Sequence, residues 1–230
     1  MKKTPVIAIS IFVATIISTV ALAKNITPTL YYAPGACSFA SRIVINELGL
    51  KYNFESVDLN THIVNSTKEN FYDINKKGGV PALTISNNES LTENGVIMQY
   101  LADKDSKHRM LPAAGKTERY RVLEMMNVVS MDLHKVVGLL FHTNLVDADK
   151  DQLMAGVKST LSFLDKSLEN KTYLVGNTFS IADSYLFTAL TWMPHIKVDL
   201  SEFKNLDKFY NTHKTRPSIE LAFAQEKNNK

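Results

Sequence analysis

The chain has 230 residues, of which 45% are hydrophobic and 21% are charged, and its formal net charge at pH 7 is +3. This is enough apolar material for one or two packed domains. The charge is too close to neutral to suggest a protein that binds nucleic acid. No low-complexity tract, glycine-rich phosphate loop or internal repeat stands out, so function must be sought in individual motifs.

Residues 1–23 differ in character from the rest of the chain. They begin with the basic letters MKK, continue as an uncharged apolar run and end in the small residues of Ala21-Leu22-Ala23. This pattern is typical of a secretory signal peptide. We expect cleavage after Ala23 and a periplasmic or secreted protein with no stable membrane association. The alternative is an inner-membrane anchor, because the apolar run approaches the length needed to span a bilayer.

Short strands and helices alternate from residue 28 to residue 105. The order predicts a mixed sheet with helices packed on it, an α/β or α+β domain. The predicted elements are a strand over 29–32, a helix over 37–49, strands over 52–59 and 80–85, and a strand that runs into a helix over 90–103.

From residue 113 to residue 230 the pattern is helical and predicts a separate all-α domain. The charged stretch 105–112 separates it from the first domain. Ser180 and Asp183 have the spacing of a capping box at a helix start. The predicted helices cover 115–141, 149–170, 180–193 and 202–217, the last of them ending near Pro217.

Cys37 is the only cysteine, so it cannot form a disulfide within the chain. Exported proteins usually pair their cysteines, which makes a lone thiol notable. At the first turn of a helix, backbone amides favour the thiolate and lower the pKa. The alternative is a small residue packed under the Pro-Gly turn, where burial raises the pKa.

Two loops and one helix carry further candidate residues. A Val80–Pro81 bond at a strand entry could be cis and present the Val80 backbone to a bound peptide, or the segment could be a plain turn. Glu93 and Asn94 open a helix that could bind a carboxylate, or Asn94 could simply cap it. Four residues share one helical face that could line a cleft or serve packing: Asn127, Met131, His134 and Gly138.

Together, the segments YYAPGACSFASR, GGVPAL, LTENGVIMQYLAD, DLHK and FSIADSYLF resemble those of glutathione S-transferases, specifically the bacterial beta class. The resemblance covers about residues 29–230. It implies a thioredoxin-like N-terminal domain that binds glutathione as co-substrate, an all-helical C-terminal domain that covers the site, a homodimer, and no metal or nucleic acid.

The resemblance also assigns residues. It places Cys37 near the glutathione sulfur, with His134 and Tyr32 as the other catalytic candidates. Where the beta class often has a lysine, this chain has His62, and Asn94 stands where serine or glycine is frequent. The glutathione-binding positions that it implies are His62, Val80, Pro81, Glu93, Asn94, Asn127 and Lys135.

The activity that the resemblance implies is conjugation of reduced glutathione to small apolar electrophiles, a detoxification reaction. Met131 and Phe141 are candidate linings of the electrophile pocket. One alternative is a monothiol redox enzyme, a disulfide reductase or peroxidase, that uses Cys37. The other is a non-catalytic protein that binds glutathione or apolar ligands.

Overall fold

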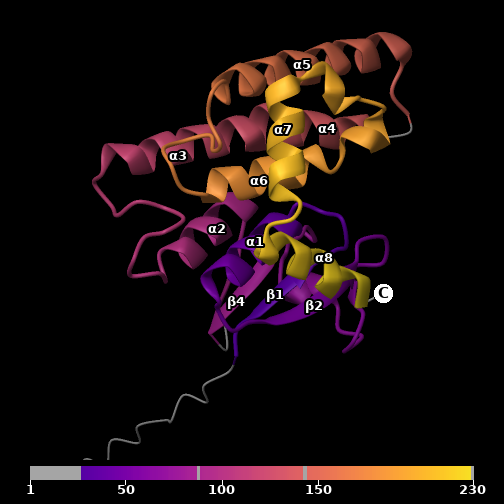
Figure 1. Ribbon diagram of the computed structural model, residues 1–230. Helices are drawn as coiled ribbons and strands as arrows, with labels where there is room; N and C mark the ends of the chain where they lie inside the picture. The colour runs from indigo at the N-terminus through magenta and orange to yellow at the C-terminus, as the bar shows by residue number, and fades with distance from the viewer. Residues whose placement is uncertain (1–26, 87–88, 142–143, 229–230) are drawn as a thin grey trace, which may run out of the picture.

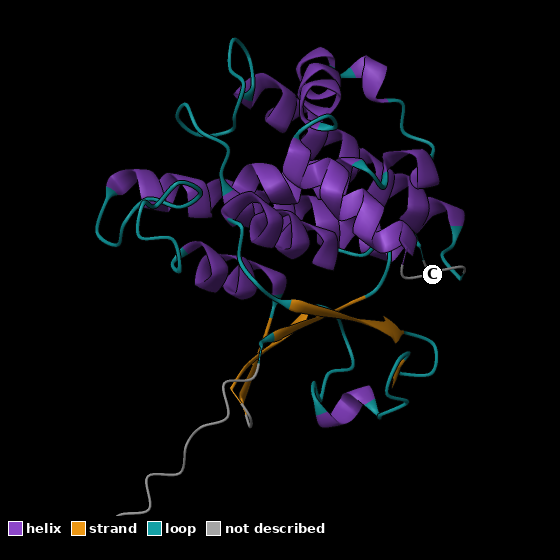
Figure 2. Cartoon of the chain, turned by 60° about the horizontal axis from the view of Figure 1, so that its bottom comes forward, coloured by secondary structure: helices purple, strands orange, loops and turns teal. Residues whose placement is uncertain are grey.

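The computed structural model of the protein describes residues 27–86, 89–141 and 144–228. The expected signal segment, 1–23, lies outside the described residues. Most of the helices lie on one side of a small sheet (Figures 1 and 2), and the first long helix lies between the sheet and the other helices (Figure 1). Among the described residues, no helix is long and apolar enough to cross a bilayer.

The sheet is mixed, as the sequence predicts, and its strand order is β3-β2-β1-β4-β5. The first two strands pair in parallel, and the other neighbours pair antiparallel. The sequence did not indicate β3 or the 3-10 helix η1 (Phe71–Asp73), because both are too short for a periodic signal. The strands are β1 (Thr29–Tyr32), β2 (Asn53–Asp58), β3 (Ile63–Val64), β4 (Ala82–Ser86) and β5 (Glu89–Thr92).

Two helices of the N-terminal domain position the candidate site. Helix α1 (Ser38–Leu48) begins directly after Cys37 and ends at Gly49, whose φ of 65° is the left-handed conformation that favours glycine. Helix α2 (Asn94–Ala102) begins directly after Glu93. The two helix starts therefore follow the two loops in which the sequence places candidate residues.

The C-terminal domain is all helical, and the resulting fold class agrees with the prediction. The predicted helix 115–141 is a continuous run of three segments, whose central part is a π-helix. The helices are α3 (Thr117–Asn127), the π-helix η2 (Val128–His134), α4 (Lys135–Leu140), α5 (Asp147–Ser167), α6 (Ile181–Leu190), the 3-10 helices η3 (Met193–Ile196) and η4 (Leu200–Glu202), α7 (Lys204–His213) and α8 (Pro217–Asn228).

Pro217, which is expected to end the preceding helix, in fact starts the last one. A proline fits the first position of a helix, because the missing N–H would have no intrahelical partner there. Helix α8 then returns to the N-terminal domain and packs beside α1 (Figure 1). The C-terminal end of the chain thus contacts the domain that carries Cys37.

Helix α6 joins the two domains. Every residue from Ile181 to Leu190 is buried, and one continuous hydrophobic cluster includes residues of both domains. The Ser184 hydroxyl donates a 2.9 Å hydrogen bond to the Ala40 carbonyl of α1. This contact fixes α1, and with it the start of the helix at Cys37, against the helical domain.

The predicted capping box at the start of α6 is confirmed. The Ser180 amide and the Leu174 amide donate to the two carboxylate oxygens of Asp183, at 2.8 and 2.7 Å. The Asp183 side chain is fully buried, and this burial raises its pKa to about 6 against the hydrogen bonds that lower it. Asp183 therefore holds both the helix start and the segment before it.

We predict that Asp183→Ala lowers the free energy of unfolding by roughly 2–4 kcal/mol, because it removes a helix cap and leaves the buried Leu174 amide without its acceptor. Chemical denaturation measures the change. Asp151→Ala, at an exposed position of α5, is the matched control. Affinity for glutathione in the folded variant should be preserved, and an intact melting curve with lost binding would contradict this structural role.

Candidate active site

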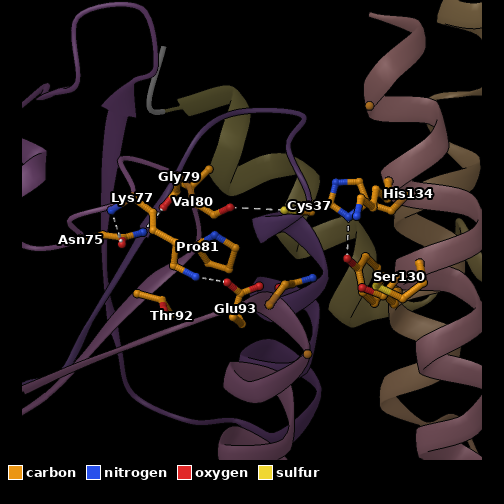
Figure 3. Close-up of a pocket in the computed structure, with 16 residues that line it drawn as sticks. Cys37, Asn75, Lys77, Gly79, Val80, Pro81, Thr92, Glu93, Ser130 and His134 are labelled. Carbon is orange, nitrogen blue, oxygen red and sulfur yellow. Dashed lines mark hydrogen bonds and ion pairs between the residues drawn. The ribbon is translucent and has the colours of Figure 1, made fainter.

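Two clefts meet at Cys37, between the loops of the N-terminal domain and the η2–α4 wall. The first has a volume of about 480 Å³ and the second about 610 Å³. Figure 3 shows the first cleft, with Cys37 between Val80 and His134. The residues that line both clefts are Cys37, Gly79, Val80, His134 and Gly138. A reaction between occupants of the two clefts would therefore take place beside the thiol.

The Cys37 thiol is held in its protonated form. Its Sγ atom donates to the Val80 carbonyl at 3.4 Å. Burial raises the pKa of Cys37 to about 12, although the amides of Cys37 and Ser38 at the helix start lower it. The sequence left open whether the helix start lowers the pKa of Cys37 or burial raises it. In the structure the effect of burial is the larger of the two. Cys37 can thus act as a hydrogen-bond donor at neutral pH.

The loop before β4 presents the Val80 backbone to both clefts. The Val80–Pro81 bond is cis, which is one of the two alternatives that the sequence left open. The Asn75 side-chain amide donates to the Gly79 carbonyl at 2.6 Å. Asn75, which also lines the first cleft, therefore supports the loop at Gly79.

His62 also supports this loop, at Gly78, but it lines neither cleft. Its Nδ1 atom lies 3.1 Å from the Gly78 carbonyl oxygen, and its ring packs on Tyr72 with centroids 4.5 Å apart. Gly78 has a φ of 66°, and a Cβ atom there would lie 2.7 Å from the Tyr72 ring. The expectation of a direct contact between His62 and glutathione is therefore not supported: His62 faces the back of the loop.

The start of α2 lies on the same side of the first cleft as the Val80 loop, opposite the η2–α4 wall (Figure 3). Glu93 has a φ of 68° and forms an ion pair with Lys77. Asn94 is the first residue of the helix, so it does not cap it. The Ser41 hydroxyl donates to Asn94 Oδ1 at 2.7 Å, while the buried Nδ2 atom of Asn94 has no hydrogen-bond partner among the described residues. A donor at this place suits a carboxylate ligand.

The π-helix changes which residues of the long helix face the cleft. The Lys135 amide donates to the Ser130 carbonyl five residues earlier, which widens the turn. His134, Lys135, Met131 and Gly138 line the first cleft together with Ser130. Asn127 is exposed and lines neither cleft, because its predicted position assumed regular α-helical spacing.

His134 is oriented by Tyr185, a residue that the sequence analysis did not single out. The Nδ1 atom of His134 lies 2.6 Å from the Tyr185 hydroxyl oxygen. Burial lowers the pKa of His134, so the ring is neutral at pH 7, and burial raises the pKa of Tyr185, which keeps its proton. A hydroxyl that donates to Nδ1 leaves the ring proton on Nε2. Only the contact between η2 and α6 reveals this pair.

Tyr32 lies outside both clefts. Its side chain is fully buried, and the guanidinium of Arg42 lies 4.0 Å from its ring centroid. The structure therefore does not bring Tyr32 together with Cys37 and His134 as a catalytic candidate. Its place at the end of β1 gives it a packing role beneath the loop that leads to Cys37.

The second cleft is the more apolar of the two. Phe141 lines it, as expected for an electrophile pocket, whereas Met131 lines the first cleft. Pro34 and Ala36 also line it, together with Trp192 and His195 from the helical domain. Among the residues that the structure describes, no group of three or more acidic, histidine or cysteine side chains could hold a metal ion.

Both parts of the chain match known protein families. Residues 27–103 match the family described as glutathione S-transferase, N-terminal domain, and residues 128–217 match the corresponding C-terminal domain. The chain is 33% identical over 197 residues to glutathione S-transferase GstA of Escherichia coli O157:H7. That alignment covers 86% of this chain and 98% of the relative.

Solved structures agree with these relatives. The chain is similar to a bacterial beta-class glutathione S-transferase of Sphingomonas chungbukensis, with a TM-score of 0.82 and 37% identity. It is also similar to a sphingomonad glutathione S-transferase in complex with glutathione, with a TM-score of 0.82 and 34% identity. Each comparison covers 86% of this chain and 98% of the other.

We predict that alkylation of Cys37 by iodoacetamide is slow at neutral pH. Because the pKa is about 12, the rate should rise about tenfold per pH unit between about pH 7 and pH 10, in step with the thiolate fraction. Mass spectrometry measures the rate without ambiguity, because the chain has one cysteine.

The same chain unfolded in urea is the control for this experiment. In the unfolded chain the Cys37 thiol is solvated, so its alkylation rate should follow the ordinary thiol pKa of about 8.5. A rate in the folded protein that levels off below about pH 8 would show a stabilised thiolate and contradict the assigned protonation state.

Proposed function

We propose that this chain, which belongs to the glutathione S-transferase family, conjugates reduced glutathione to small apolar electrophiles. The observation that carries the proposal is the meeting of a polar and an apolar cleft at Cys37 and His134. Glutathione is a charged peptide and suits the first cleft. The electrophile suits the second, so that the glutathione sulfur and the electrophilic carbon meet where the clefts join.

The first cleft offers complementary groups along its length. The γ-glutamyl carboxylate of glutathione would lie at the start of α2, where helix amides and the buried Asn94 Nδ2 atom are donors. The Glu93 carboxylate is suited to the ammonium group of the same end. The exposed Lys135 ammonium, on the opposite wall, is suited to the second carboxylate.

The protein would catalyse the reaction by stabilising the thiolate form of bound glutathione. The Cys37 thiol would turn from the Val80 carbonyl and donate its one proton to the glutathione sulfur, as would the Nε2 proton of His134. Both hydrogen bonds lower the pKa of the bound glutathione thiol. The thiol proton passes to solvent. With an aryl halide, the sulfur forms a bond to the ring carbon and the halide departs with its bonding electrons.

The protonation state of Cys37 favours conjugation over the monothiol redox alternative. A redox mechanism needs Cys37 as the attacking thiolate, whereas burial raises its pKa to about 12. In conjugation the attacking sulfur belongs to glutathione, so a protonated Cys37 is no obstacle. Non-catalytic binding would use the same first cleft and is distinguished by the absence of turnover.

We propose further that the chain belongs to the beta class, is a homodimer and serves detoxification. The beta-class structural relative and the GstA similarity support the class assignment. We also propose that residues 1–23 are a cleaved signal peptide, supported by their composition alone.

We predict that the mature chain conjugates glutathione to chlorodinitrobenzene. Cys37→Ala should lower kcat by no more than about tenfold, because it removes one neutral hydrogen bond to the sulfur. The absorbance of the conjugate measures turnover. Loss of all turnover in a folded Cys37→Ala variant would assign the chemistry to Cys37, and no turnover in the unsubstituted chain would reject conjugation.

We predict that Lys135→Met raises the KM for glutathione about threefold to tenfold, because it removes one partly solvated ion pair. The KM for chlorodinitrobenzene should stay constant. Lys150→Met, at an exposed position of α5, is the matched control for the lost charge. Equal values for Lys135→Met and the control would place the glutathione carboxylate elsewhere.

We predict that the chain expressed with its leader in a bacterial host accumulates without residues 1–23. The small residues that end this segment are the pattern that signal peptidase requires. The intact mass of the protein from the periplasmic fraction measures the cleavage. A full-length mass in the membrane fraction would favour the anchor.

A further inference from the structure

The loop of Pro34, Gly35 and Ala36 forms part of the wall of the second cleft only. All three residues line the second cleft, and none lines the first. The loop leads directly into Cys37 at the start of α1. Its conformation therefore bears directly on the electrophile side of the site and on the surroundings of the thiol, while none of its three residues forms a wall of the glutathione side.

Gly35 is held at both of its backbone polar groups by side chains of the helical domain. Its amide donates to Glu226 Oε2 at 2.9 Å, and its carbonyl accepts from Trp192 Nε1 at 2.8 Å. Gly35 has a φ of 73°, so the chain turns at this residue. Trp192 and Glu226, which are 34 positions apart in the sequence, thus both fix a single turn of the N-terminal domain.

The Glu226 carboxylate is itself held by a buried cation. Its Oε1 atom lies 3.9 Å from Nε of Arg42, whose side chain is fully buried. The Arg42 guanidinium lies between the rings of Tyr32 and Phe54, 4.0 Å from each centroid. Because a buried guanidinium needs an anion nearby, Arg42 stabilises Glu226 in the place from which it reaches Gly35.

We propose that Glu226, at the end of α8, is a positioning residue for the second substrate. By fixing Gly35, it sets the wall of the second cleft and the cover over Cys37. The predicted effect of Glu226 on the KM for the electrophile rests on the proposed function. The inference goes beyond that function in assigning control of the electrophile side to the C-terminal helix, although Glu226 lines neither cleft.

Glu226→Gln tests this role, because the amide keeps the shape of the side chain but has one acceptor oxygen in place of two. An NH2 group must then face either the Gly35 amide or Arg42, both of which are donors. The KM for chlorodinitrobenzene should rise about fivefold or more as the cleft wall loses its fixed position, while the KM for glutathione changes by less than about twofold. Glu220→Gln, at an exposed position of the same helix, is the matched control.

The reactivity of Cys37 gives a second readout that needs no catalytic activity. At fixed pH, alkylation of Cys37 by iodoacetamide should be about threefold or more faster in Glu226→Gln, because local opening of the loop uncovers the thiol. If the unsubstituted chain shows no turnover, the proposed function fails and the alkylation rate alone decides the role of Glu226.

Two results would overturn the proposal. One is an unchanged alkylation rate in a folded Glu226→Gln variant. The other is an equal rise in both KM values, which would indicate general loosening of the protein. If Glu226→Gln does not fold, Glu226→Asp keeps the charge beside Arg42 and withdraws the carboxylate from Gly35. It should then show the same faster alkylation, and an unchanged rate would again overturn the proposal.

Discussion

The packing of α6 against α1 is the contact on which the site depends. Ser184 bonds to the Ala40 carbonyl in the middle of a buried interface, and the two helices share one hydrophobic cluster. Because α1 begins just after Cys37, fixing this helix fixes the position of the thiol. The same α6 carries Tyr185, which orients His134. One interface therefore sets the positions of the thiol, the imidazole and the phenol together.

Burial decides the electrostatics of that arrangement. A helix start favours a thiolate, but a thiol partly buried between two domains loses solvation, and this desolvation raises the pKa of Cys37. The neutral His134 follows from the same cause. A site of neutral donors suits a negatively charged sulfur brought by a ligand, which is why the structure supports chemistry at glutathione rather than at the protein thiol.

The π-helix and the last helix show where sequence patterns misled. Spacing of 3.6 residues per turn placed Asn127 on the cleft face, yet the wider turn of η2 leaves it outside and presents Ser130 instead. Pro217 suggested an end and in fact begins α8. Both errors arise because tertiary contacts select among local conformations that a sequence permits equally.

The sequence by itself determined the mixed sheet, the helical second domain, the capping box at Ser180 and Asp183, and the loops that carry Cys37 and Val80. These follow from periodicity, turn residues and helix-start signals, which are local. Only the tertiary structure decided the protonation of Cys37 and the pairing of His134 with Tyr185. It also moved His62 to the back of its loop. Each of these depends on burial or on contact between distant segments, and no local pattern encodes the distance between them.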